Sequence, residues 1–322
     1  MNKTLKIFFM CFSIVILLVR CGKKEEERTA AEETKKEVTS GAINVDGFEL
    51  SYFIEGTGVP VVVLEGILYP DFFSKELKRH VKFIYADTRF LIPTETPEVI
   101  ITYTMDTFID DIEQIRGTLG FDKIAVLGHS RIGFLLLEYA KKYPENTSHA
   151  IVIGTPPYFN TEKYDKAVAE FWDTDASQER KAILKSNQEK LNEDTLSSVS
   201  PAEAFIMAYV ADAPKFFLDP LYDASWAMQR LINRDFSMDV ANHYSTVVLK
   251  NYDITNIYSQ IKTPVFIAVG RYDYWAPYFL WDEVKDLLPN HSFNLFEKSS
   301  HFPMFEEQEL FDKKLIEWIK SH

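Results

Sequence analysis

The 322-residue sequence predicts an α/β fold, in which helices wind around a mostly parallel sheet and an inserted helical cap interrupts the order of elements. Three observations predict this fold. Strand-type and helix-type segments alternate up to residue 154, a mostly helical stretch follows, and strand-type segments resume at Pro264. Hydrophobic residues make up 46% of the chain, which is enough for one large core together with an insertion.

The first half of the predicted sheet opens with a hairpin. Two short alternating runs flank Asp46-Gly47, a dipeptide that favours the tight turn between antiparallel strands. Apolar runs of strand length then alternate with segments of helical periodicity, as expected for a parallel sheet that is covered on both faces. The predicted elements are hairpin strands 43–45 and 48–53, strands 60–64, 81–86, 123–127 and 150–153, and helices 72–78, 107–119 and 132–143.

The second half of the sheet follows the insertion. Helical periodicity without strand-type runs places the cap at 156–255, so the core is predicted to consist of residues 42–155 and 256–322. After the cap we expect strands 264–269 and 292–296 and helices 278–288 and 308–319. The core is therefore predicted to be one domain whose two parts are separated in sequence by the cap.

Charge and cysteine content exclude several classes of function. A net charge of −13 opposes binding to nucleic acid, which needs clustered lysines and arginines. The two cysteines, Cys11 and Cys21, lie near the amino terminus, so the folded part has no thiol for a disulfide or a nucleophile. The histidines are scattered without a His-x-x-x-His pair. We expect no metal, no cofactor and no nucleic-acid partner.

The amino terminus has the features of a bacterial export signal. Lys3 and Lys6 precede the uncharged run 7–19, which is shorter than the roughly 20 apolar residues of a membrane-spanning helix. The run ends in Leu18-Val19-Arg20-Cys21, which resembles the lipobox at which bacterial lipoproteins are cleaved and then lipidated on the cysteine. Residues 1–21 are therefore predicted to be a signal peptide, with Cys21 as the lipidation site.

Residues 22–41 are rich in charged side chains and threonine, a composition that predicts a flexible tether. A lone helix is the alternative, because glutamate and lysine are compatible with one. Arg20 stands where a lipobox has a small residue, so an uncleaved signal anchor is an alternative to lipidation. Both interpretations attach the domain to a membrane of the bacterial cell envelope and place it outside the cytoplasm.

Ser130 is the candidate nucleophile. Segment 125–133 runs from a buried strand through Gly128-His129-Ser130 directly into a helix. A sharp strand-to-helix turn exposes the serine hydroxyl and brings the next amide, that of Arg131, to the positive end of the helix, where it would stabilise an oxyanion. An ordinary strand-to-helix turn is the alternative interpretation of the tripeptide.

Two later loops supply the base and the acid that a serine nucleophile needs. Asp273 follows the predicted strand 264–269, and His301 follows the predicted strand 292–296. Both side chains are therefore expected just beyond the carboxyl ends of strands, where open α/β sheets build their sites. The other histidines lack such a context and are expected to be structural or exposed. They are His80, His129, His149, His243, His291 and His322.

Together these segments resemble the α/β-hydrolase family. The family's catalytic residues follow in the order Ser, Asp, His, and loops 270–273 and 300–306 are similar to its acid and histidine loops. The resemblance covers the chain from about Gly41 to the end and implies a serine hydrolase with Ser130, Asp273 and His301 as its catalytic triad. Segments 104–120 and 137–144 are most similar to the branch containing proline iminopeptidases and related esterases.

Three loops depart from the family pattern. Leu64-Glu65-Gly66-Ile67 stands where His-Gly is usual, and the resemblance implies that the Ile67 amide completes the oxyanion hole with that of Arg131. We expect Glu65 to face away from the oxyanion. Asp87-Thr88-Arg89-Phe90 lacks the family's glycine, and Ile132 replaces a glycine at a normally crowded position two residues after the serine. We expect a narrower pocket or, if catalysis was lost, a fold retained for binding.

Three hypotheses of function follow. The first is an esterase-like hydrolase of small acyl substrates, the second is an aminopeptidase of the proline iminopeptidase kind, and the third is a non-catalytic envelope binding protein. The substrate would be a small-molecule ester, an amide or a short peptide, and the oligomeric state stays open.

The cap is expected to supply the substrate pocket. Its aromatic and methionine side chains would line an apolar acyl pocket, although many of them are expected to pack the cap onto itself. The candidates are Phe205, Met207, Phe216, Phe217, Trp226 and Met228. An aminopeptidase would also need a carboxylate for the free ammonium group of its substrate. The acidic candidates in the cap are Glu203, Asp212, Asp219 and Asp223.

Overall fold

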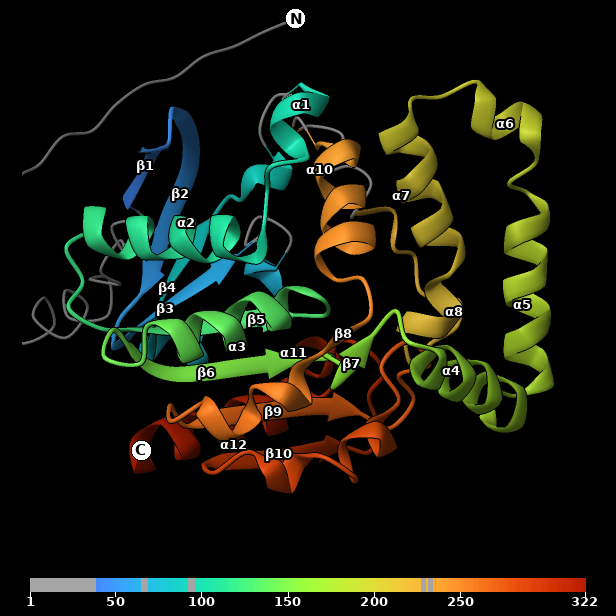
Figure 1. Ribbon diagram of the computed structural model, residues 1–322. Helices are drawn as coiled ribbons and strands as arrows, with labels where there is room; N and C mark the ends of the chain where they lie inside the picture. Colours follow the sequence, from blue (N-terminus) through green and yellow to red (C-terminus); the bar gives the residue numbers. More distant parts are fainter. Residues whose placement is uncertain (1–38, 65–68, 92–95, 227–229, 231–233, 235) are drawn as a thin grey trace, which may run out of the picture. The chain divides into compact units, whose positions relative to one another are not determined.

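Eight strands form one sheet in the order β1-β2-β4-β3-β5-β6-β9-β10 (Figure 1). The computed structural model describes residues 39–322 apart from 65–68, 92–95, 227–229, 231–233 and 235. Strand β2 pairs antiparallel with both neighbours and all other pairs are parallel, so β2 alone among the eight runs in the opposite direction. The strands are β1 (Thr39–Val45), β2 (Phe48–Gly56), β3 (Val59–Leu64), β4 (Val81–Ala86), β5 (Ile124–His129), β6 (Thr147–Ile153), β9 (Val265–Gly270) and β10 (His291–Phe296). The predicted fold class is confirmed.

The hairpin between β1 and β2 forms at the predicted dipeptide. Asp46 and Gly47 have φ angles of +52° and +92°, the left-handed conformations that a type I′ turn requires. The Gly47 amide donates to the Asn44 side chain at 3.1 Å, and Val45 pairs with Phe48 across the turn. Local turn chemistry therefore sets the register of the first two strands.

Alternate residues of the central strands face two separate parts of the core. Val62 of β3 packs in the cluster that contains residues of α2 (Met105–Thr118) and α3 (Ile132–Lys142). Val61 packs in the cluster that contains residues of α12 (Gln308–Ser321). Because both faces of the sheet are covered, its strands read as continuous apolar runs rather than as alternating patterns.

Two predicted helices are wrong. Segments 72–78 and 278–288 form short 3₁₀ turns, namely η2 (Pro70–Phe72), η3 (Leu77–Arg79), η8 (Tyr278–Trp281) and η9 (Lys285–Leu287). In the first segment Phe72 stacks on Phe305 and Phe73 stacks on Phe83, each with ring centroids 4.6 Å apart. In the second the ring N–H of the fully buried Trp281 donates to the Thr155 carbonyl at 2.8 Å. These tertiary contacts override the helical periodicity.

The inserted cap lies between β6 and β9 and is mostly helical. At its base the short strands β7 (Tyr158–Phe159) and β8 (Tyr252–Asp253) pair antiparallel and bring the start and the end of the insertion together. Its helices are α4 (Glu162–Asp175), α5 (Gln178–Glu189), α6 (Glu193–Ser197), α7 (Pro201–Ala211), α8 (Ala213–Phe216), α10 (Met238–His243) and the π-helical turn η5 (Tyr244–Val248).

The remaining elements are short. They are α1 (Pro97–Ile100), α11 (Pro303–Glu306), η4 (Arg89–Leu91), η6 (Ile254–Asn256) and η7 (Tyr258–Gln260). Within the described ranges, no helix combines the length and the apolar character that crossing a membrane requires.

Candidate active site

Ser130 occupies a strained turn between β5 and α3. Its φ angle is +56°, in the left-handed region that residues other than glycine rarely adopt. The Ser130 amide donates to the Ile153 carbonyl at 2.8 Å, and the Thr155 hydroxyl donates to the Ser130 carbonyl at 2.8 Å. These bonds hold the strained conformation, and strain of this kind is concentrated at functional sites.

Two glycines make room for this turn. A Cβ atom at Gly128 would lie 2.8 Å from the Gly133 nitrogen, and one at Gly133 would lie 2.1 Å from the Thr155 hydroxyl oxygen. Ile132, the side chain expected to be crowded, is instead accommodated at 3% exposure, where it packs in the core and lines a cavity. The position after the serine that excludes a side chain is therefore 133 and not 132.

Asp273 and His301 form a buried pair. Asp273 follows β9, and its Oδ1 accepts from the amides of Trp275 at 2.9 Å and Ala276 at 2.8 Å. Its Oδ2 accepts from His301 Nδ1 at 2.7 Å. Because a carboxylate only accepts, Nδ1 carries a proton, which leaves Nε2 as the ring nitrogen that faces other partners. His301 and Ser130 line the same cavity, so the structure brings the three predicted residues together.

His129 belongs to the same site, although its sequence context gave it no role. The ring is buried, and burial lowers its pKa well below 6.5, so it is neutral. Its Nε2 lies 2.9 Å from the His301 carbonyl oxygen, which accepts, so Nε2 carries the proton. The Tyr69 hydroxyl then donates to Nδ1 at 3.1 Å. His129 thus connects the segment after β3 to the histidine loop. Its position directly before Ser130 in the sequence was the signal that could have placed it in the site.

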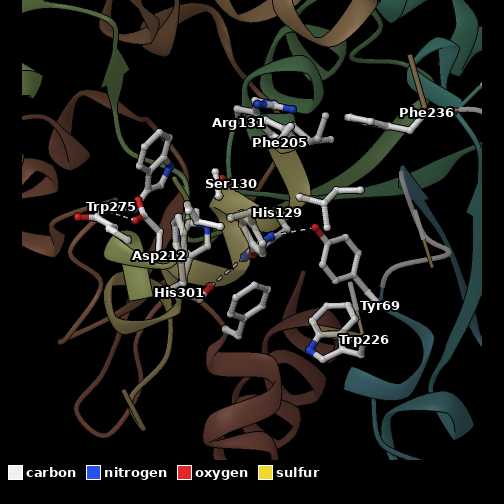
Figure 2. Close-up of a pocket in the computed structure, with 18 residues that line it drawn as sticks. Tyr69, His129, Ser130, Arg131, Phe205, Asp212, Trp226, Phe236, Trp275 and His301 are labelled. Carbon is white, nitrogen blue, oxygen red and sulfur yellow. Dashed lines mark hydrogen bonds between the residues drawn. The ribbon is translucent and has the colours of Figure 1, made fainter. Parts of the chain in front are cut away.

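A cavity of about 570 Å³ lies over Ser130 (Figure 2). Its walls come from the core and the cap and are mostly aromatic or aliphatic. The lining residues are Tyr69, His129, Ser130, Arg131, Ile132, Gln188, Leu191, Phe205, Ile206, Ala208, Tyr209, Asp212, Phe216, Trp226, Phe236, Trp275, His301 and Phe302. A cavity of this size and character suits a small organic substrate.

Three of the six cap candidates line this cavity: Phe205, Phe216 and Trp226. Met207 is half-buried and is not part of the lining. Phe217 is not part of it either, because its ring is buried between Tyr222 and Phe302, with centroids 4.2 Å and 4.7 Å away. Met228, Glu65, Ile67 and Cys21 lie outside the described residues.

Asp212 is the one acidic candidate of the cap that lines the cavity, and its charge is already paired. Its Oδ1 accepts from the Gln188 side chain at 2.9 Å, and its Oδ2 lies 3.0 Å from the Lys215 ammonium. The other three carboxylates serve local turns and caps. Glu203 accepts from the Ser200 amide, Asp219 from the Leu221 amide and Asp223 from the Ser225 amide.

Glu306 joins the cap to the histidine loop. Its two carboxyl oxygens accept from the Leu218 amide of the cap and the Ser300 amide beside His301, both at 2.6 Å. Burial raises the pKa of Glu306 to about 7, although the hydrogen bonds from the Leu218 and Ser300 amides lower it. The group is therefore partly protonated at neutral pH.

This raised pKa predicts how stability changes with pH. Because the folded-state pKa of Glu306 exceeds its ordinary value of 4.5, its contribution to stability is complete below pH 4.5 and is lost as the pH rises through about 7. We expect the free energy of unfolding to fall by up to about 3 kcal/mol over this window. Urea denaturation at a series of pH values measures the fall, and Glu306→Gln should make it smaller. Parallel profiles for the two proteins would show that Glu306 does not titrate in this way.

The chain is similar in sequence and in fold to several known proteins. A family model described as alpha/beta hydrolase fold matches residues 60–308. The chain is 31% identical over 288 residues to the AB hydrolase superfamily protein YclE of Bacillus subtilis, with 87% of this chain and 98% of that protein covered. It is 27% identical over 297 residues to a proline iminopeptidase of Heyndrickxia coagulans, with coverage of 88% and 99%. An alpha/beta fold family hydrolase from Bacillus anthracis superimposes with a TM-score of 0.65 at 23% identity, covering 88% and 99% of the two chains.

Proposed function

Because the chain belongs to the α/β-hydrolase family and is a hydrolase, we propose that it cleaves carboxylic esters with apolar groups, with Ser130 as nucleophile. The observation that carries this proposal is the position of Ser130 and His301 on one mostly apolar cavity, with His301 Nδ1 held by Asp273. The fixed ring proton leaves Nε2 as the base for the serine hydroxyl.

The chemistry follows from these positions. Ser130 Oγ attacks the ester carbonyl as His301 Nε2 takes its proton, and the same proton then passes to the departing alcohol. The Arg131 amide, at the N-cap of the eleven-residue helix α3, would stabilise the oxyanion together with the Ile67 amide. Water then cleaves the acyl enzyme by the same route.

Active-site labelling followed by a substrate panel tests this function. A fluorophosphonate should label the full-length protein and should not label Ser130→Ala. Butyl esters from acetate to decanoate should then be hydrolysed faster than aminoacyl anilides. Failure of the folded wild-type protein to label would instead support a non-catalytic binding protein.

An aminopeptidase is the second candidate, because the chain is similar to a protein named proline iminopeptidase and because Asp212 lines the cavity. The substrate ammonium would have to compete with Lys215, which already pairs with Asp212. Faster turnover of a prolyl anilide than of every ester, with a selective loss of that activity in Asp212→Asn, would favour this candidate.

We also propose that the hydrolase is attached to the bacterial envelope through a lipid on Cys21. The basic start, the short apolar run and the charged segment after it support this proposal. Radiolabelled palmitate should enter the wild-type protein and should be absent from Cys21→Ala, with Cys11→Ala as the matched control. Labelling that persists in Cys21→Ala, or an intact and unlabelled amino terminus, would indicate a signal anchor.

A further inference from the structure

The Arg131 side chain is a second feature of the cavity, separate from the Arg131 amide. It is half-buried and lines the cavity beside the nucleophile. The Arg131 carbonyl accepts from the Tyr244 hydroxyl at 3.1 Å and from the Phe134 amide at 3.3 Å, so the backbone that carries the side chain is fixed. In the view of Figure 2, Arg131 lies with Phe205 and Phe236 on one side of Ser130.

Among the residues that the structure describes, the Arg131 guanidinium has no hydrogen-bond or ion-pair partner. The other described arginines differ: Arg89 pairs with Asp111 at 2.7 Å, and Arg271 pairs with Asp175 at 2.8 Å. Arg79, Arg116, Arg230 and Arg234 also pair with carboxylates, and Arg180 donates to backbone carbonyls. Carboxylates outnumber lysines and arginines by 48 to 35 in the chain, and among the arginines that the structure describes only the Arg131 guanidinium lacks a hydrogen-bond or ion-pair partner.

The charges around the cavity leave this guanidinium available to a ligand. Asp212 is the only carboxylate among the described lining residues, and Lys215 neutralises it at 3.0 Å. Figure 2 shows Asp212 with Trp275 and His301, away from Arg131. A half-buried guanidinium has lost part of its hydration without gaining a partner, and an anion bound beside it would offset that loss.

We propose that the substrate carries an anionic group, a carboxylate or a phosphate, close to the ester bond, and that the Arg131 guanidinium binds this group. This inference rests on the proposed ester hydrolysis. The Cα atoms of consecutive residues are about 3.8 Å apart, so the side chain that would bind this group starts from the residue next to the nucleophile and lines the same cavity. The planar guanidinium can donate to two oxygens of such a group at once. The apolar walls accept the rest of the substrate.

Matched esters test the charge requirement. Monobutyl glutarate, butyl glutaramate and butyl 4-phosphonobutanoate share one ester and differ in a terminal carboxylate, neutral amide or phosphonate. Wild-type kcat/KM should be about tenfold to a hundredfold higher for the better anionic ester than for the amide, as a charge-assisted hydrogen bond predicts. The ranking of carboxylate against phosphonate distinguishes the two sources of charge. Arg131→Gln should abolish the preference and Arg131→Lys should retain part of it.

The control is Arg79→Gln, because Arg79 is exposed and pairs with Glu76 outside the cavity. This variant should keep the full preference for the anionic esters. Equal wild-type kcat/KM for all three esters would overturn the anionic substrate and leave ester hydrolysis standing. A preference that survives in Arg131→Gln would overturn the role of Arg131.

A binding measurement separates this inference from the proposed function. Calorimetry with Ser130→Ala and the intact esters should give a Kd for the anionic ester that rises about tenfold or more when Arg131→Gln is added. If Arg131→Gln raises this Kd but the wild-type protein hydrolyses none of the esters, ester hydrolysis is refuted and an anion site at Arg131 is supported. Equal Kd values with and without Arg131→Gln would refute the anion site.

Discussion

Alanine at Ser130 or at His301 is expected to reduce kcat for ester hydrolysis by about four to six orders of magnitude, and the double variant is expected to lose little more. The reason is geometric. His301 Nδ1 is held by Asp273 at 2.7 Å, so in the proposed mechanism the imidazole acts through Nε2 on one proton, that of the serine hydroxyl. Without Ser130 the base has no proton to take, and without His301 the hydroxyl has no base.

Steady-state kinetics on the two single variants and the double variant checks this expectation. Ser197→Ala is a matched control, because Ser197 is exposed in the cap and donates to the Asp194 carbonyl. Its kcat should equal that of the wild type. Losses that multiply in the double variant would mean that Ser130 and His301 act in separate steps, which would contradict the shared mechanism.

The sheet was predictable wherever the local sequence alone determines the backbone conformation or the burial of a strand. Asp46-Gly47 specifies its turn through two positive φ angles, and the apolar runs of the parallel strands follow from burial on both faces. Segment 278–288 was not predictable in this way. Its helical periodicity is real, but the bond from Trp281 to the Thr155 carbonyl joins residues far apart in the sequence, which no local pattern encodes.

The same distinction applies to the site. The places of Ser130, Asp273 and His301 in the fold could be predicted because each follows a strand, and the carboxyl ends of parallel strands meet at one edge of the sheet. The cap residues were harder. Phe216 and Phe217 are neighbours with the same side chain, yet only Phe216 lines the cavity, because Phe217 stacks on Phe302. Which side of a short helix faces the substrate depends on how the cap packs, and the sequence carries no periodic signal for it.

The substitution Gly133→Ala, which adds one methyl group, is expected to destabilise the protein by about 3 kcal/mol and to slow fluorophosphonate labelling of Ser130 at least tenfold. The new Cβ would lie 2.1 Å from the Thr155 hydroxyl oxygen, which holds the Ser130 carbonyl through a 2.8 Å bond. Relief of that overlap must move Thr155 or the start of α3, and overpacking of this kind typically costs about 1–3 kcal/mol, occasionally more. Because Ser130 sits at a strained φ of +56°, movement of its support also displaces the hydroxyl. Urea denaturation and fluorophosphonate labelling measure the two effects.

Two further variants decide whether the overlap with Thr155 causes the expected loss of stability. Gly117→Ala adds the same methyl group at an exposed position of α2 with nothing within 4 Å, so it should be neutral or stabilise the helix by up to about 1 kcal/mol. Thr155→Gly removes the side chain that the Gly133 methyl group would meet. Combined with Gly133→Ala it should therefore recover part of the lost stability, although the hydrogen bond to the Ser130 carbonyl stays absent. Strictly additive losses in the double variant would show that the two residues do not collide, and the requirement for glycine at 133 would then have to arise from the α3 backbone.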